Sequence, residues 1–225
     1  MLTNDILSEI IIQYNDTLSI TKLFHLISYS QYVYSHIIHF DSIFKQHISL
    51  NWNILITRFD KNKLLVDDVL RWASYYGHIE VVKFLIQNGA DIHARNDDAL
   101  RWASYYGHLE VVKFLIQNGA DIHARDDDAS REASQKGHLE VLKLLIRNSA
   151  NIHAMDDQAL RWASENGHLE VVNFLIQNGA NIHARDDRAL RWASEKGHLE
   201  IVKFLIQNGA DIHAMNDYAL REVVI

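Results

Sequence analysis

Ten histidines recur in two regular rows, and histidine is a residue type that binds metal ions. The rows are His78, His108, His138, His168 and His198, and His93, His123, His153, His183 and His213. An imidazole nitrogen must approach zinc to about 2.0–2.1 Å, but packed helices lie about 8–10 Å apart. One histidine per helical unit therefore cannot give one ion two ligands. We predict no metal site and no cofactor, and expect hydrogen bonds from these rings to tie turns to helices.

Catalytic chemistry is not indicated either. The chain has no cysteine, which excludes thiol nucleophiles and thiolate metal sites. The sequence contains no nucleophile elbow, phosphate-binding loop or metal-binding signature. A residue that recurs in every copy of a repeat is also poor evidence for a unique active site. We predict that the protein is not an enzyme.

The histidine rows belong to a longer repeat, in which most of the neighbouring residues recur as well. From Asp67 to Asn216 the chain repeats every 30 residues, five times over. Such a period is the signature of a solenoid, whose units bury their apolar faces against their neighbours. We expect two domains, a segment over 1–66 and a repeat array over 67–225. The array consists of units 67–96, 97–126, 127–156, 157–186 and 187–216 and a partial unit 217–225.

Each unit predicts two helices, with the second unit as the example. Asp97, which recurs in every copy before an Ala-Leu-rich run, is expected to be the N-cap of the first helix. Gly107 can adopt the left-handed conformation that ends this helix near Tyr106. The second helix opens at His108 and ends at Asn118. Its apolar stripe is Leu109, Val112, Leu115 and Ile116.

The third unit departs from the pattern. Ser130 and Glu132 replace a leucine and a tryptophan, and Ser149 replaces the glycine after the second helix. A residue other than glycine in the left-handed region costs roughly 1 kcal/mol or more. We predict that this unit is the weak joint of the array.

The unit resembles the ankyrin repeat in its second half. The residues that carry the resemblance are the run Gly107–Ile116, which begins G-H-L-E, and Gly119–Ile122, which reads G-A-D-I. The resemblance implies an all-α, ankyrin-type helical solenoid with a helical N-terminal cap. The period is 30 residues rather than 33, and the motif T-P-L-H-x-A is replaced by x-A-L-R-W-A. The β-hairpin finger of the family should then be a stubbier finger or a plain loop. This short form is similar to the ankyrin-repeat families of giant DNA viruses.

Solenoids of this kind usually hold protein partners, so we looked for positions that are free of packing constraints. The pair Tyr75–Tyr76 recurs as Tyr105–Tyr106 but becomes Gln135–Lys136 in the third unit. Such variation on a fixed scaffold favours exposed positions, and aromatic and arginine side chains are frequent hot spots. The predicted partner-binding residues are Tyr75, Tyr76, Tyr105, Tyr106, Trp72, Trp102, Arg71 and Arg101.

The arginine row has two interpretations. It consists of Arg71, Arg101, Arg131, Arg161, Arg191 and Arg221, and every member follows a recurring aspartate by four residues. The guanidinium groups either bond to these aspartates within or between units, or form a basic stripe for an acidic partner.

The first 66 residues have a different composition, with no glycine. Their apolar residues recur at helical spacing, which predicts two or three short helices that cap the first repeat. The run Leu2–Ile10, which reads L-T-N-D-I-L-S-E-I, resembles the F-box start L-P-x-E-I-L, with Thr3 in the place of the proline. This resemblance implies binding to a Skp1-type adaptor of a ubiquitin ligase. The residues that would contact it are Leu2, Ile6, Leu7 and Ile10.

Charge and hydropathy limit the other partners. The net charge is −7, and the repeats carry the whole excess, with 24 acidic against 17 basic residues. A nucleic-acid binder normally has a basic stripe, so we expect no nucleic-acid partner. No apolar stretch reaches the 18 residues of a membrane span, and the acidic start at Asp5 argues against a secretory signal. We expect a soluble, intracellular monomer, located in the host cytoplasm if the protein is viral.

Overall fold

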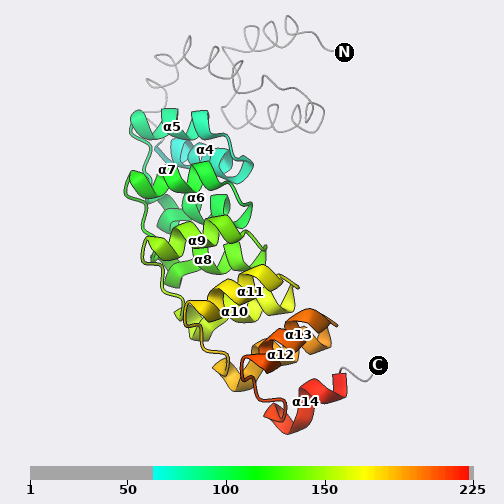
Figure 1. The fold of residues 1–225 in the computed structure, drawn as a ribbon. Coiled ribbons are helices and arrows are strands. Elements are labelled where there is room, and N and C mark those ends of the chain that lie inside the picture. The colour runs from blue at the N-terminus through cyan, green and yellow to red at the C-terminus, as the bar shows by residue number, and fades with distance from the viewer. Residues whose placement is uncertain (1–62, 223–225) are drawn as a thin grey trace, which may run out of the picture. The chain divides into compact units, whose positions relative to one another are not determined.

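The computed structural model describes residues 63–222, and every element in that range is a helix. The helices follow one another in pairs, from α4 in cyan to α14 in red (Figure 1). This part of the chain is therefore all-α, as the sequence predicts. The bounds are α4 Lys63–Tyr76, α5 Ile79–Gln87, α6 Ala94–Tyr105, α7 Leu109–Gln117, α8 Ala124–Gln135, α9 Leu139–Arg147, α10 Ala154–Glu165, α11 Leu169–Gln177, α12 Ala184–Glu195, α13 Leu199–Gln207 and α14 Ala214–Glu222.

Each helix pair packs on the next one mainly through its first helix. Helix α6 contacts α4 before it and α8 after it, and the same holds along the series to α14. The second helices α5, α7, α9, α11 and α13 lie on the first helix of their own pair and touch one another less (Figure 1). Contacts of this kind, between neighbouring units only, define the predicted helical solenoid.

Small side chains let the first helices approach one another closely. Ala103 and Ser104 of α6 have no exposed surface, and neither have Ala133 and Ser134 at the same places in α8. A larger side chain at these places would push neighbouring units apart, because protein interiors are packed without spare space. The Ala-Ser pair therefore sets the spacing of the array.

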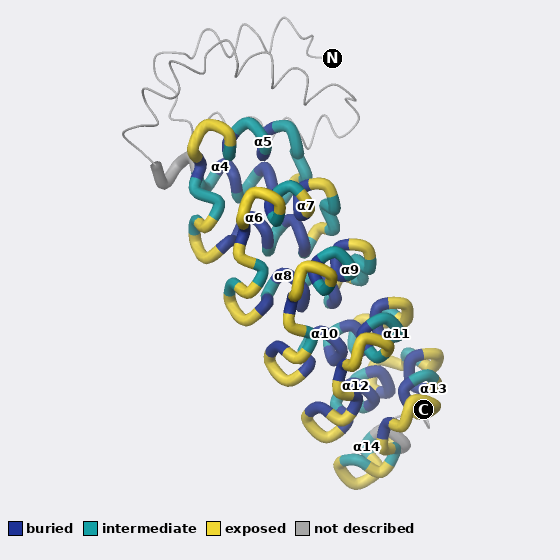
Figure 2. Tube along the Cα trace, turned by 60° about the vertical axis from the view of Figure 1, so that its left-hand side comes forward, coloured by how far each residue is buried: buried dark blue, intermediate teal, exposed yellow. Residues whose placement is uncertain are grey.

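The apolar core of each unit lies where the two helices meet (Figure 2). In the second unit it consists of Leu100 from α6 and Val111, Val112 and Leu115 from α7, each at most 1% exposed. Fully burying such a side chain contributes about 1.5–3 kcal/mol. Because first helices pack on both neighbours, this core is continuous from one unit to the next.

The predicted stripe of the second helix is correct in only two of its residues. Val112 and Leu115 are buried, but Leu109 and Ile116 are partly exposed. Val111 is buried although it lies outside the predicted stripe. The reason is that α7 contacts α5 and α9 as well as α6, so its buried face is wider than one stripe.

The turn between the two helices depends on a glycine. Gly107 has a φ of +75°, as predicted for the residue that ends the first helix. A Cβ atom at this position would lie 2.5 Å from Nδ1 of His138 in the next unit. The glycine is therefore required both for its backbone conformation and for the space that it leaves.

The connection between units is a left-handed turn. Arg125, Asp126 and Asp127 have φ values of +54°, +57° and +59° and form a kink at the start of α8. The same three positions have positive φ at the start of α6, α10, α12 and α14. No strand occurs in residues 63–222, so of the two expected forms, a stubbier finger or a plain loop, the structure has the one without a β-hairpin. A run of three residues other than glycine with positive φ costs on the order of 1–3 kcal/mol per residue, so other contacts must stabilise this turn.

The N-cap prediction for the recurring aspartate is wrong. The carboxylate of Asp127 accepts hydrogen bonds from Nδ1 of His123 (3.1 Å) and from the backbone N–H of Asn151 (2.7 Å). Neither donor belongs to the helix that Asp127 precedes. The bond to Asn151 instead joins the start of the third unit to its end. Asp67, Asp97, Asp157 and Asp187 make the equivalent bond in the other units.

An arginine holds the carbonyl groups of the left-handed turn. Arg131 donates from Nε to the carbonyl oxygen of Asp126 (3.0 Å) and from Nη2 to that of Arg125 (2.8 Å). Arg161 and Arg191 repeat this pattern in their own units. A planar guanidinium can bind two acceptors at once, so it stabilises the shortened connection.

Ser149 takes the place of the glycine after the second helix of the third unit. Its φ is +75°, in the left-handed region that the sequence comparison between units predicts.

The sequence-based boundary before Asp67 does not coincide with the start of a helix, since α4 begins at Lys63. In the part of the chain that the structure describes, no helix is long and apolar enough to cross a membrane.

Candidate partner-binding surface

One side of the first helices carries the partly exposed arginine, tryptophan and tyrosine positions, and we call it the first-helix surface. In α6 these positions are Arg101, Trp102 and Tyr105, and Tyr106 follows as the C-cap of the helix. They lie opposite Leu100 and Ala103, which face the core, because residues three and four apart share one face of a helix. The equivalent positions of α4, α8, α10 and α12 continue this surface, although Arg131 in α8 and Arg161 in α10 are buried.

Six aromatic side chains meet on this surface in the first two units. The ring of Tyr75 lies 4.2 Å from that of Tyr106 and 5.3 Å from that of Trp102, measured between centroids. The two tyrosine hydroxyls are hydrogen-bonded at 2.7 Å. We call the group the aromatic cluster. Its members are Trp72, Tyr75, Tyr76, Trp102, Tyr105 and Tyr106.

The cluster is both ordered by its own contacts and open to solvent. Tyr76 is 39% exposed and Tyr106 is 37% exposed. Burial, followed by the hydrogen bond to Tyr75, raises the pKa of Tyr106 well above its ordinary value. Burial and Tyr75 also raise the pKa of Tyr76. These phenols therefore stay neutral at physiological pH and can offer both apolar ring surface and hydroxyl groups to a partner.

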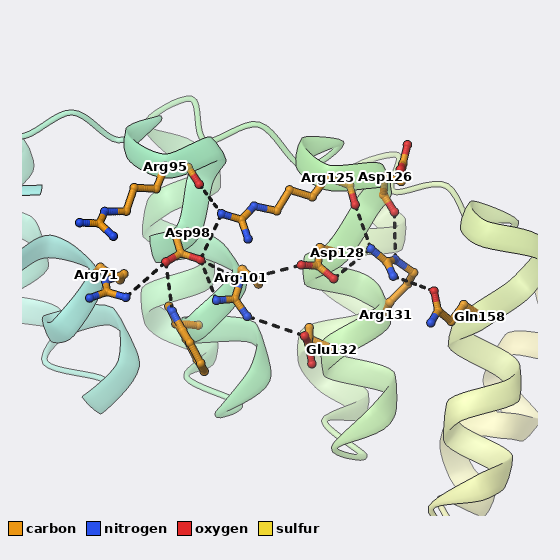
Figure 3. Close-up of polar contacts among 11 residues, drawn as sticks. Arg71, Arg95, Asp98, Arg101, Arg125, Asp126, Asp128, Arg131, Glu132 and Gln158 are labelled. Carbon is orange, nitrogen blue, oxygen red and sulfur yellow. Dashed lines mark hydrogen bonds and ion pairs between the residues drawn. The ribbon is translucent and has the colours of Figure 1, made fainter. Parts of the chain in front are cut away.

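Charged side chains form a ladder beside the aromatic cluster (Figure 3). Asp98 lies at its centre, with only 6% of its side chain exposed. Its carboxylate is 2.7 Å from Arg101, 3.7 Å from Arg71 and 3.7 Å from Arg125. It also accepts a hydrogen bond of 3.2 Å from the indole N–H of Trp102. One carboxylate therefore connects the first helices α4, α6 and α8 and orients a tryptophan of the surface.

The ladder continues into the third and fourth units. Arg101 also lies 3.8 Å from Asp128 and 3.7 Å from Glu132. Arg131 pairs with Asp128 at 2.9 Å and donates to the side chain of Gln158 at 2.7 Å. Burial, followed by repulsion from Asp128, raises the pKa of the Glu132 carboxyl. In Figure 3 these side chains follow one another from helix to helix along the array.

The arginine row does not use the acceptors that the sequence predicts. Arg101 bonds to Asp98, at the position after the recurring Asp97, and Arg131 bonds to Asp128 and to turn carbonyl groups. Arginine–carboxylate pairs within and between units are therefore present, as one interpretation predicts, but their carboxylates are not those of the recurring aspartates. The residue at the position of Asp98 varies between units. Its spacing of three residues from Arg101 is the signal that could have identified it.

The two histidine rows make the predicted structural hydrogen bonds. Nε2 of His138 lies 3.0 Å from the carbonyl oxygen of Tyr105 in the preceding unit, and Nε2 of His108 lies 2.9 Å from that of Tyr75. The other row bonds to the recurring aspartates. Among the described residues, no group of three His, Asp or Glu side chains could hold a metal ion.

The predicted partner-binding residues all lie on the first-helix surface. Six of them form the aromatic cluster, and Arg71 and Arg101 lie in the charged ladder. The predicted adaptor-binding residues Leu2, Ile6, Leu7 and Ile10 lie outside the described residues.

A comparison with protein families gives one match. The family described as ankyrin repeats (3 copies) matches residues 41–126 and 131–216. The gap between the two matches falls at the start of the divergent third unit, and the first match begins inside the segment 1–66. No curated protein matches the chain significantly.

Proposed function

The chain belongs to the ankyrin-repeat family, and on that premise we propose that it is a non-catalytic module that binds a protein partner through the aromatic cluster. The observation that carries the proposal is the exposure of adjoining aromatic rings over two consecutive units. Contiguous exposed apolar surface on a soluble domain is typical of interaction sites.

Comparison within the chain supports a functional role for the tyrosines. The third unit folds with Gln135 and Lys136 at the places of Tyr105 and Tyr106, and the later units have Glu165–Asn166 and Glu195–Lys196. The fold therefore does not require tyrosine at these places. Buried rings at an interface contribute strongly to binding, and tyrosine and tryptophan are enriched among hot spots.

The arrangement of the cluster also supports binding. Tyr75 contacts Trp102 and Tyr106 of the next unit, and Lys136 lies over the ring of Tyr105 at 4.5 Å. Side chains already held by such contacts lose little conformational freedom when a partner binds, so less of the binding energy is spent on ordering them. The acidic balance of the repeats, 24 acidic against 17 basic residues, favours a protein over a nucleic acid as this partner.

The adaptor hypothesis for Leu2, Ile6, Leu7 and Ile10 stays a prediction. It is tested separately, by a pull-down of a Skp1-type adaptor with the full chain and with a variant in which these four residues are alanine. A monomeric state of the chain is likewise a prediction, checked by light scattering.

The test of the proposed function exchanges residues between units. A variant with Tyr75→Gln, Tyr76→Lys, Tyr105→Gln and Tyr106→Lys carries at the first two units the pair that the third unit already accommodates. We expect the same helix content by circular dichroism and a loss of affinity of about tenfold or more for a partner captured by the wild-type chain. The control variant Glu195→Gln with Lys196→Gln changes the same positions of the fifth unit. Equal affinity of the tyrosine variant and the wild type would overturn the proposal.

A further inference from the structure

The arginine row changes its surroundings between the second unit and the fourth. Arg101 lies within 4 Å of three carboxylates, those of Asp98, Asp128 and Glu132. A shift of 60 residues leads from Arg101 to Arg161. The residues that correspond to the three acids are then Gln158, Arg188 and Trp192.

This exchange leaves three arginines without acidic partners. Among the described residues, no carboxylate forms an ion pair with Arg161, Arg188 or Arg191, which we call the arginine cluster. Arg161 and Arg191 use Nε and Nη2 to bind turn carbonyl groups, which carry no net charge. The Nε of Arg188 is buried and has no hydrogen-bond partner. The described part of the chain therefore provides these three guanidinium groups with no paired carboxylate.

The cluster is gathered around one tryptophan ring. The guanidinium carbon of Arg188 lies 4.6 Å from the ring centroid of Trp192, and that of Arg161 lies 5.8 Å from it. Burial, followed by repulsion from Arg185 and Arg188, lowers the pKa of Arg161. Asp156 and Asp157 act on this pKa in the opposite direction, and Asp156 is itself bound by Arg185 at 2.8 Å. Like charges are thus held together on the first-helix surface.

We propose that the arginine cluster binds an acidic peptide segment of a protein partner. Its carboxylates would pair with Arg188 and Arg191, which are partly exposed, because Arg161 is only 3% exposed. The chain itself provides the precedent, because its own acids bind Arg101, which stands at the position of Arg191 in the second unit, at 2.7–3.8 Å. Arginine recognises carboxylates with two parallel hydrogen bonds. The proposal rests on the proposed function, because it assigns a second contact to the same protein-binding surface.

Because the net charge of the chain is −7, we expect an acidic peptide to bind only near the arginine cluster. Exposed charges farther away than a Debye length of about 8–10 Å are largely screened in physiological salt. An acidic peptide would therefore be repelled by most of the array but attracted at the fourth and fifth units. Binding there should depend on individual arginines and not on the total charge of the protein.

The experiment uses the full chain and a fluorescent decaglutamate peptide, with decaglutamine as the uncharged probe. The variant Arg188→Asp installs the residue that the second and third units carry at this position as Asp98 and Asp128. The matched control Lys203→Asp makes the same charge change in the same unit, on α13. From fluorescence anisotropy we expect Arg188→Asp to weaken decaglutamate binding about tenfold or more, and Lys203→Asp to weaken it about twofold or less.

Three outcomes would overturn the proposal. They are equal losses in the two variants, equal binding of decaglutamine and decaglutamate, and no binding of decaglutamate by the wild type. If Arg188→Asp disturbs the fold, Arg188→Gln replaces it, since Gln158 stands at this position in the fourth unit. If the arginine variants bind decaglutamate normally while the tyrosine variant still loses its partner, only the arginine proposal fails.

Discussion

The imidazole of His138 fills the space beside Gly107 that the side chain of any other residue would need. A Cβ atom on Gly107 would lie 2.5 Å from Nδ1 of this ring. The ring in turn holds the end of the preceding unit's first helix, because its Nε2 lies 3.0 Å from the carbonyl oxygen of Tyr105. The glycine of one unit thus accepts the histidine of the next, and this interlock recurs at Gly77, Gly137 and Gly167 but not at Gly197.

The first prediction concerns this interlock. Gly107→Ala places a methyl group against the ring of His138 and forces alanine into a backbone conformation with φ of +75°. We expect unfolding free energy to fall by about 1–2 kcal/mol for the backbone and by about 1–3 kcal/mol more for the overlap. Urea unfolding followed by circular dichroism measures the change.

Gly119→Ala is the matched control for the interlock. Gly119 has a φ of +94°, but nothing lies within 4 Å of the Cβ position. The control variant therefore carries only the backbone cost of about 1–2 kcal/mol. Equal losses in the two variants would show that the contact with His138 contributes nothing.

The second prediction is a loss of stability in mild acid. Burial lowers the pKa values of His108 and His138 below the ordinary value of 6.5. The unfolded chain then binds more protons than the folded chain at pH values between the folded pKa and 6.5. Stability is therefore complete above pH 6.5 and decreases as the pH falls through this window.

Urea unfolding between pH 7.5 and pH 5 tests this titration. The double variant His108→Gln with His138→Gln keeps a donor for the carbonyl groups but cannot be protonated. We expect its urea midpoint to change less with pH than that of the wild type. An unchanged slope in the double variant would mean that other groups cause the acid sensitivity.

The repeat sequence predicts the array well but not the connections within it. Helix ends at Gly107 and burial of Val112 and Leu115 follow from local pattern, because glycine conformation and helical periodicity are short-range properties. The burial of Val111 could not be seen in a single stripe, since it arises from neighbours in adjacent units. Tertiary contacts decide such positions.

The errors at Asp97 and Asp98 have a common cause. An aspartate before a helical run normally caps that helix, but the left-handed turn of the shortened connection directs the Asp97 carboxylate to the N–H of Asp121 (2.8 Å). Asp98 then becomes the partner of Arg101. Three consecutive residues with positive φ have no signal in a sequence without glycine at those positions, so the role of Asp97 could not be predicted. The role of Asp98 has a signal in its spacing of three residues from Arg101.

The third prediction concerns the divergent unit. Ser149 adopts a φ of +75°. The other four complete units have a glycine at this position, which is Gly89, Gly119, Gly179 or Gly209. Ser149→Gly should raise the unfolding free energy by about 1 kcal/mol, because glycine adopts this conformation without the steric cost. Urea unfolding measures the gain.

Hydrogen exchange tests whether the third unit is the weak joint. We expect the amides of 127–156 to exchange faster than those of 97–126 in the wild-type chain, and the difference to shrink in the Ser149→Gly variant. Equal protection of the two units in the wild type would contradict the prediction. The reverse substitution, Gly119→Ser, should weaken the second unit by a similar amount.

The fourth prediction follows from the role of arginine in the left-handed turn. Arg161 is 3% exposed and donates to the carbonyl oxygens of Asp156 (3.1 Å) and Met155 (2.7 Å). Lysine has one compact ammonium group and cannot reproduce a planar pair of donors. Because a hydrogen bond to a charged group contributes about 1.5–3 kcal/mol, Arg161→Lys should lower the unfolding free energy by about that amount. The turn carbonyl groups would lose a partner, so amide exchange at 155–157 should also accelerate.

Arg71→Lys is the control, since Arg71 contacts Asp68 and Asp98 at 3.9 and 3.7 Å, distances at which a lysine charge serves as well. If both variants lose the same stability, the arginine acts through its charge alone, and the shortened connection must be held by other contacts.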